Sequence, residues 1–255
     1  RRKVHYLSTR NNQLKESFLN ILFRGLSKDG GLFLPSEWPT ISLKNLQGKS
    51  YQEVAHSIIY PYIQDDISYV DLQLIINTAY ESFDHKKIAP LVNIDQNKYI
   101  LELFYGPTFA FKDYALQFLG SLFSYLLNQS KKKITVLGAT SGDTGSAAIN
   151  AFKGKNDIEV FILHPHNNVS EVQRRQMTTV EENNIHNFAI EGTFDDCQNI
   201  VKKLFVDEEI QSKTSLTAIN SINWIRIIAQ TVYYFWSYLQ LNEEKVNFIV
   251  PSGNF

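Results

Sequence analysis

Short apolar runs alternate with helix-like segments over the second half of the chain, and this alternation limits the possible folds more than any other feature. The runs are rich in β-branched residues and lie at 133–139, 158–163, 186–190, 215–219 and 246–250. A segment with helical periodicity separates each run from the next, which predicts successive strand–helix–strand units. Such units form a parallel sheet that is buried on both faces, so the expected fold class is α/β.

The first 95 residues follow a different pattern, and we expect them to be mostly helical. Apolar residues recur at helical spacing in 16–26, 51–63 and 70–83, and a Gly-rich turn is predicted at 28–35. The 255 residues are enough for one large domain or two ordinary ones with a substantial core.

Composition excludes several classes of protein. A net charge of -1 and a pI near 6.7 give no electrostatic reason to expect a nucleic acid or an anionic membrane as partner. The single cysteine, Cys197, excludes an internal disulfide framework and fits a reducing compartment such as the cytoplasm. The most apolar stretch, 222–241, carries Asn223, Arg226 and Gln230, so it predicts a buried helix rather than a membrane span. Because the chain starts without Met and stops directly after "PSGNF", we expect further residues beyond both ends.

Lys112 is placed unusually for a lysine, between an apolar lead-in broken by Pro and Gly and an apolar helical stripe. The stripe predicts a buried helix that begins near this lysine. Burial and the positive end of the helix dipole both disfavour a charged amine there, so we expect a lowered pKa. Such an amine can act as a nucleophile and form a Schiff base. The simpler alternative is a packed stem with the charged end in solvent.

Two loops after predicted strands could bind an anion, because ligands of parallel sheets bind at the carboxyl ends of the strands. Residues 140–146, "TSGDTGS", combine two glycines with hydroxyl side chains ahead of a predicted helix. They match neither the P-loop nor the dinucleotide pattern, so we expect a carboxylate or phosphate cradle. A capped helix start is an equally simple interpretation. The stretch 251–254 repeats the design after the last predicted strand.

Arg226 lies in a third segment with polar groups, which follows the predicted strand at 215–219 and includes Asn220 and Ser221. An arginine on an apolar helix is unfavourable unless it is paired. It therefore either binds an anion through its planar fork or makes a structural ion pair, and the ion pair is the simpler interpretation.

Together these stretches resemble the threonine synthase family, pyridoxal-phosphate enzymes of fold type II, the fold shared with the tryptophan synthase β subunit. The resemblance covers nearly the whole chain and is most specific in "ELFYGPTFAFKD" and "VLGATSGDTGSAA". It also includes "SFLNILFRGLSKDGGLFLP", "HPHNNVSEVQRRQMTTV", "EGTFDDCQNIVKKLF", "NSINWIRIIAQTVYYF" and "VPSGNF". It implies pyridoxal 5'-phosphate as cofactor and O-phospho-L-homoserine as substrate, with L-threonine and phosphate as products.

The resemblance also implies roles for individual residues. Lys112 would bind the cofactor as a Schiff base and act as the catalytic base. The other implied residues are Thr140, Ser141, Gly142, Asp143 and Thr144 for the substrate carboxylate, Asn220, Ser221 and Arg226 for its phosphate, and Ser252, Gly253, Asn254 and Phe255 for the cofactor phosphate. In the family the last of these loops continues beyond Phe255.

Three regions are expected on this basis: a mostly helical region at 1–97, a large cofactor domain from 98–130 and 217–255, and a small α/β domain at 131–216 that carries the substrate loop. We expect a monomer or a homodimer. Two alternatives stay open: a related phospholyase that releases 2-oxobutyrate, and a non-catalytic fragment.

Overall fold

A parallel sheet of four strands is the centre of the second half of the chain. The computed structural model describes residues 4–25, 27–219, 223–241 and 243–252. The strands lie in the order β8-β7-β6-β9, and every neighbouring pair is parallel. Their bounds are β6 (Ile134–Ala139), β7 (Ile158–Pro165), β8 (Ile185–Ile190) and β9 (Leu216–Ala218). The parallel sheet and the α/β class predicted from the alternation are confirmed.

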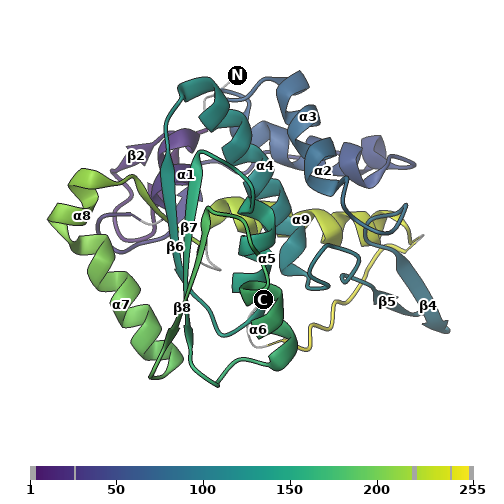
Figure 1. The fold of residues 1–255 in the computed structure, drawn as a ribbon. Helices are drawn as coiled ribbons and strands as arrows, with labels where there is room; N and C mark the ends of the chain where they lie inside the picture. Colours follow the sequence, from purple (N-terminus) through teal and green to yellow (C-terminus); the bar gives the residue numbers. More distant parts are fainter. Residues whose placement is uncertain (1–3, 26, 220–222, 242, 253–255) are drawn as a thin grey trace.

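Helices cover both faces of this sheet (Figure 1). On one face lie α5 (Asp143–Phe152) and α6 (Glu171–Thr178), and on the other lies α7 (Phe194–Val206), which α8 (Glu208–Lys213) follows. Alternate strand residues point to opposite faces. Val136 accordingly packs in the main core with α5, whereas Leu137 packs in a second cluster with Cys197 of α7.

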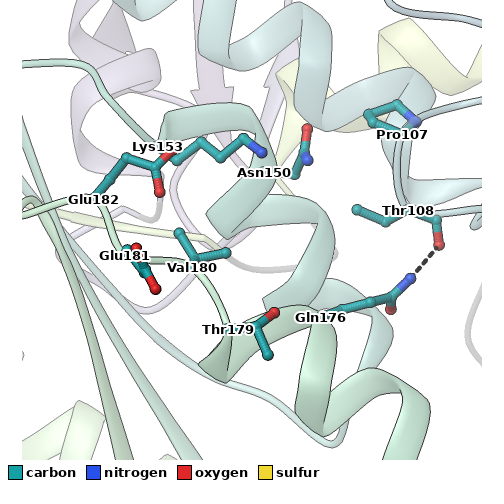
Figure 2. Close-up of a pocket in the computed structure, with 9 residues that line it drawn as sticks. All are labelled: Pro107, Thr108, Asn150, Lys153, Gln176, Thr179, Val180, Glu181 and Glu182. Carbon is teal, nitrogen blue, oxygen red and sulfur yellow. Dashed lines mark hydrogen bonds between the residues drawn. The ribbon is translucent and has the colours of Figure 1, made fainter.

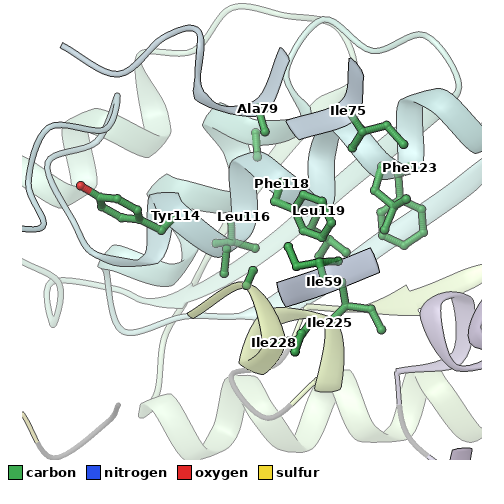
Figure 3. Close-up of a cluster of buried hydrophobic side chains, with 14 of the residues drawn as sticks. Ile59, Ile75, Ala79, Tyr114, Leu116, Phe118, Leu119, Phe123, Ile225 and Ile228 are labelled. Atoms are coloured by element: carbon green, nitrogen blue, oxygen red, sulfur yellow. The ribbon is translucent and has the colours of Figure 1, made fainter. Parts of the chain in front are cut away.

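A helical layer packs against α5 and holds most of the core. It consists of α2 (Tyr51–Ile63), α3 (Tyr69–Tyr80), α4 (Lys112–Ser130) and α9 (Trp224–Leu239). Helix α4 packs against α3, α5 and α9. Figure 3 shows side chains of all four helices meeting around Leu116 and Leu119. The helix starts are set locally: Thr193 and Asp196 form the reciprocal capping box that their spacing predicts at the start of α7.

Two small antiparallel sheets were not predicted. Strands β1 (Tyr6–Ser8), β2 (Lys15–Glu16) and β3 (Phe33–Pro35) pair in the order β2-β1-β3, next to α1 (Phe18–Arg24) and ahead of the 3-10 helix η1 (Leu43–Leu46). Strands β4 (Leu91–Asp95) and β5 (Lys98–Leu101) form a hairpin. Strands of two or three residues are too short to show a period of two, so the pattern of β1–β3 was not visible.

The strand expected at 246–250 is wrong. In the part of the chain that the structure describes, these residues form no strand and follow α9 as an irregular segment. Phe248 packs its ring on Tyr234 at 4.8 Å, but Ile249 is 93% exposed. A β-branched run becomes a strand only where another strand can pair with it, and no described strand lies alongside.

The main hydrophobic core runs through all three predicted regions, from Val4 to Trp236. It includes Ile59 of α2, Leu116 of α4 and Ala148 of α5. The division at 97, 130 and 216 therefore stays a prediction. Among the described residues, no helix is both long and apolar enough to cross a membrane.

Candidate active site

Lys112 is the first residue of helix α4, as the sequence predicts, and only 4% of it is exposed. Its Nζ donates a 2.9 Å hydrogen bond to Oδ2 of Asp143, with which it forms an ion pair. The same nitrogen lies 4.3 Å from the centre of the Phe111 ring. The amine is therefore buried and faces the turn after β6, as expected. The uncharged amine stays a prediction, because in this structure the amine faces a carboxylate.

The turn after β6 is built around the side chain of Thr140. This residue is 2% exposed, and its Oγ1 accepts hydrogen bonds from the N–H groups of Gly142 at 3.0 Å and Gly145 at 2.8 Å. Helix α5 begins directly afterwards at Asp143. The threonine hydroxyl thus satisfies N–H groups at the helix start, as a capping side chain does.

Gly142 has a backbone conformation that only glycine adopts readily, with φ 153° and ψ -88°. An added Cβ would also lie 2.1 Å from Oε1 of Gln173 in α6. At Gly145 an added Cβ would lie 2.5 Å from Cγ2 of Thr140. Both glycines in the turn are therefore required by its geometry, and the turn brings its backbone close to its neighbours.

The carboxylate of Asp143 connects the turn to the lysine. Its Oδ1 accepts a 2.9 Å hydrogen bond from the N–H of Thr144, and its Oδ2 accepts from Lys112. A carboxylate in the first turn of a helix is stabilised by the positive end of the helix dipole. Ser141 of the same loop is exposed, and Thr144 is half-buried. The sequence indicated Asp143 as part of a substrate loop but not as the partner of Lys112.

Arg226 supplies a second buried cation. It lies in the first turn of α9, after Asn223, whose Oδ1 caps that helix by accepting from the N–H of Ile225 at 2.8 Å. Arg226 is 1% exposed, and its Nε and Nη1 have no hydrogen-bond partner among the described residues. Burial lowers its pKa to about 10, while the attraction of Asp143 acts in the opposite direction. The guanidinium is therefore charged at neutral pH, and two of its three nitrogens are not satisfied by the residues that the structure describes.

An unsatisfied buried cation of this kind fits an external anion. The alternative, a structural ion pair that satisfies Arg226, is not found among the residues that the structure describes.

Adjacent parallel strands explain why the charged groups of Lys112, Asp143 and Arg226 lie in one region. β6 leads into the turn before Asp143, and its parallel neighbour β9 leads toward α9. Both connections therefore start at the carboxyl ends of neighbouring strands.

Several predicted site residues cannot be placed. Asn220, Ser221, Gly253, Asn254 and Phe255 lie outside the described residues, so their implied roles stay predictions. Ser252 is described and is exposed in the segment after α9.

A cavity of about 610 Å³ lies beside this site rather than at it (Figure 2). Its lining comes from α5 and the residue after it, from α6 and the segment 179–182 that follows it, and from the loop before α4, and includes Pro107, Thr108 and Gln176. Gln176 Nε2 donates a 3.1 Å hydrogen bond to the backbone oxygen of Thr108 along one wall of this cavity. The charged groups described above do not line it, so we place the candidate chemistry at Lys112, Asp143 and Arg226.

Comparison with known proteins identifies the family of the chain. A family model described as "Pyridoxal-phosphate dependent enzyme" matches residues 84–255, and one described as "Threonine synthase N terminus" matches residues 5–80. The chain belongs to the pyridoxal-phosphate-dependent enzyme family, and its fold is the type II fold of that family. Within the family, the resemblance to threonine synthases is confirmed by a curated threonine synthase and by a solved threonine synthase structure.

The threonine synthase of Pseudomonas aeruginosa is 47% identical over 99% of this chain and 55% of its own length. A crystal structure of threonine synthase from Brucella melitensis with bound pyridoxal phosphate has a TM-score of 0.88 at 46% identity, over 95% of this chain and 53% of its own. A protein named "Threonine synthase-like 2" from Xenopus laevis is 36% identical over 98% of this chain and 55% of its own length. The chain thus spans about half the length of the relatives it matches.

Proposed function

We propose that this protein is a threonine synthase, which converts O-phospho-L-homoserine and water to L-threonine and phosphate with pyridoxal phosphate as cofactor. The observation that supports it best is the pair of buried cations that act on the carboxylate of Asp143 at the start of α5: Lys112 pairs with it at 2.9 Å, and Arg226 is attracted to it. The similarity to threonine synthases over nearly the whole chain supports the same reaction.

The residues present fit this cofactor. Its aldehyde requires a lysine amine, and Lys112 is a buried lysine that a nearby carboxylate holds in place. When bound, pyridoxal phosphate supplies an electron-accepting ring that stabilises negative charge at the substrate's α-carbon. A buried setting keeps water away from that charge and strengthens every ionic contact around it.

The chain's own residues would bind the substrate and move its protons. The N-terminal turn of α5, with Ser141, Gly142 and Thr144, would bind the α-carboxylate through N–H and hydroxyl donors. The Arg226 guanidinium would bind the phosphate group with its unpartnered Nε and Nη1. The Lys112 amine, released from the cofactor by the substrate amine, would take the α-proton and later a β-proton.

The proposed reaction balances. The bond between the γ-carbon and the phosphate oxygen breaks, and its electron pair leaves with the phosphate, whose charge Arg226 would stabilise. The γ-carbon gains one proton and the β-carbon loses one. Water then adds its hydroxyl to the β-carbon and its remaining proton leaves with the phosphate, while the α-proton returns.

One assay tests this proposal against both alternatives. The protein is loaded with pyridoxal phosphate and given O-phospho-L-homoserine, and phosphate, threonine and 2-oxobutyrate are measured together. We expect phosphate and threonine in equal amounts. Phosphate with 2-oxobutyrate in place of threonine would identify a phospholyase. No phosphate release, together with no borohydride-trapped cofactor on Lys112, would identify a non-catalytic protein.

A further inference from the structure

Asp113, next to the candidate lysine, is a fully buried carboxylate that the proposed chemistry does not use. It is 0% exposed, yet both of its oxygens are satisfied by one residue. Oδ2 accepts a 2.8 Å hydrogen bond from the N–H of Thr108, and Oδ1 accepts a 2.6 Å hydrogen bond from the Thr108 hydroxyl. No described cation pairs with Asp113, so its carboxylate is kept in the interior by these hydrogen bonds.

The turn that Asp113 holds is strained and closely packed. Phe109 has a left-handed backbone, with φ 60°, which is unfavourable for a bulky side chain. The turn is closed by a 3.1 Å hydrogen bond from the N–H of Phe109 to the oxygen of Gly106. An added Cβ at Gly106 would lie 2.5 Å from Cβ of Asp113, so only glycine lets the carboxylate reach Thr108. A strained turn persists only where its surroundings hold it, and Asp113 holds this one through both of its carboxylate oxygens.

This turn leads directly into Lys112. Helix α4 lacks a side-chain cap at its first residues, since Phe111 makes none. The double hydrogen bond from Thr108 to Asp113 ties the first turn of α4 to the turn before it and fixes the direction in which the chain enters α4. Because Lys112 is the first helical residue, that direction determines where its amine points.

A second contact connects the turn to the substrate side of the site. Helix α6 holds the backbone oxygen of Thr108 through Gln176 (Figure 2), and Gln173 of the same helix packs on Gly142. One helix therefore contacts both the turn before the lysine and the turn that would bind the substrate carboxylate.

We propose that Asp113 is a positioning residue, which holds the turn at 106–109 through Thr108 and so directs the Lys112 amine at Asp143 and at the cofactor aldehyde. The part of this inference that concerns the cofactor aldehyde rests on the proposed function. Asp113 is not itself expected to touch cofactor or substrate.

The test compares variants that keep and remove the two hydrogen bonds. In Asp113→Asn the amide oxygen can accept from the Thr108 N–H and the amide nitrogen can donate to the Thr108 hydroxyl, so both bonds are kept. Asp113→Ala removes both. Asp71→Ala is the matched control, because Asp71 also lies in the first turn of a helix but away from Lys112.

Three measurements are made on each variant of the full chain: the rate at which pyridoxal phosphate is attached to Lys112, hydrogen exchange at the Thr108 amide, and the free energy of unfolding. Attachment is measured by borohydride trapping and peptide mass. We expect Asp113→Ala to slow attachment by about tenfold or more, Asp113→Asn by less than about threefold, and Asp71→Ala not at all. We expect faster exchange at Thr108 in Asp113→Ala only.

Two results would overturn the proposal. Equal slowing in Asp113→Asn and Asp113→Ala would show that charge rather than hydrogen bonding matters. Unchanged attachment in Asp113→Ala, with the protein folded, would show that the turn does not direct the lysine. If the unmodified protein attaches no cofactor, the proposed function fails instead, and exchange at Thr108 still decides whether Asp113 holds the turn.

Discussion

The first turns of α4 and α9 pose the same physical problem and solve it differently. Each places a cation, Lys112 or Arg226, in the interior and at the positive end of a helix. Both positions disfavour a positive charge. Lys112 has a carboxylate 2.9 Å from its amine, whereas two nitrogens of Arg226 have no hydrogen-bond partner in the part of the chain that the structure describes.

The difference indicates different tasks. A cation whose partner is built into the chain is held in position before any ligand arrives, as a nucleophile should be. A buried cation without such a partner is destabilising until an anion binds. The fold therefore prepares Lys112 for chemistry and Arg226 for recognition. The experiments below test this contrast, beginning with the largest expected effect.

Replacing Lys112 by Ala should abolish the proposed reaction. We expect a loss of about a thousandfold or more in turnover, because the nucleophile and the base are removed together. Lys155→Ala is the control: this half-buried lysine, whose own pKa is lowered by burial, donates to Ser124 at 2.8 Å and lies outside the site. Threonine release is the measurement for both variants. A comparable loss of turnover in Lys155→Ala would show that the effect of Lys112→Ala is not specific to the site.

Replacing Arg226 by Met should separate function from stability. We expect kcat/KM for the phosphorylated substrate to fall about a hundredfold, because the phosphate loses its charged donor. Without ligand, the free energy of unfolding should rise by about 1–3 kcal/mol, because a buried cation lacking full hydrogen bonding is removed. Urea denaturation with and without phosphate measures this. A less stable variant would mean that Arg226 is structural, as the sequence alone suggested.

The pH dependence of stability sharpens the same point. Burial lowers the pKa of Arg226 to about 10 in the folded protein, well below the ordinary value that it has in the unfolded chain. Between these values the folded state has released a proton that the unfolded state still binds, so stability rises with pH, by at most about 1.4 kcal/mol per unit. We therefore expect the unmodified protein to gain stability relative to Arg226→Met between pH 9 and 11. If the difference in free energy of unfolding between the two proteins stays constant with pH, burial does not lower the pKa of Arg226.

The sheet and the two cations could be predicted from the sequence because their signals are local. The β-branched runs of β6 to β9 alternate with helices, and the apolar stripe after Lys112 indicates burial of that lysine. The same signal failed at 246–250, because a run of that kind becomes a strand only when another strand pairs with it, and pairing is not a local property.

Partners far apart in the sequence could not be predicted. Lys112 and Asp143 are 31 positions apart, and Gln176 and Thr108 are 68 apart. No spacing rule joins such pairs, since only the packing of α4 against α5, and of α5 against α6, brings them together. The double hydrogen bond between Thr108 and Asp113 is short in range, and a threonine five residues before an aspartate at a helix start was its only signal.

Replacing Asp143 by Asn should give the smallest effect, because its side chain is 37% exposed and water screens its charge. We expect the free energy of unfolding to fall by about 1 kcal/mol or less, since the Lys112 amine loses its counter-charge while the amide oxygen can still accept from the N–H of Thr144. The control is Asp95→Asn, which breaks a 3.0 Å ion pair with Lys98 whose side chains are 61% and 68% exposed. Urea denaturation should show a larger loss for Asp143→Asn than for Asp95→Asn, because only the first leaves a buried cation without its partner. Equal losses would mean that the pairing of Lys112 is no stronger than an ordinary surface contact, and the contrast between the two cations would then disappear.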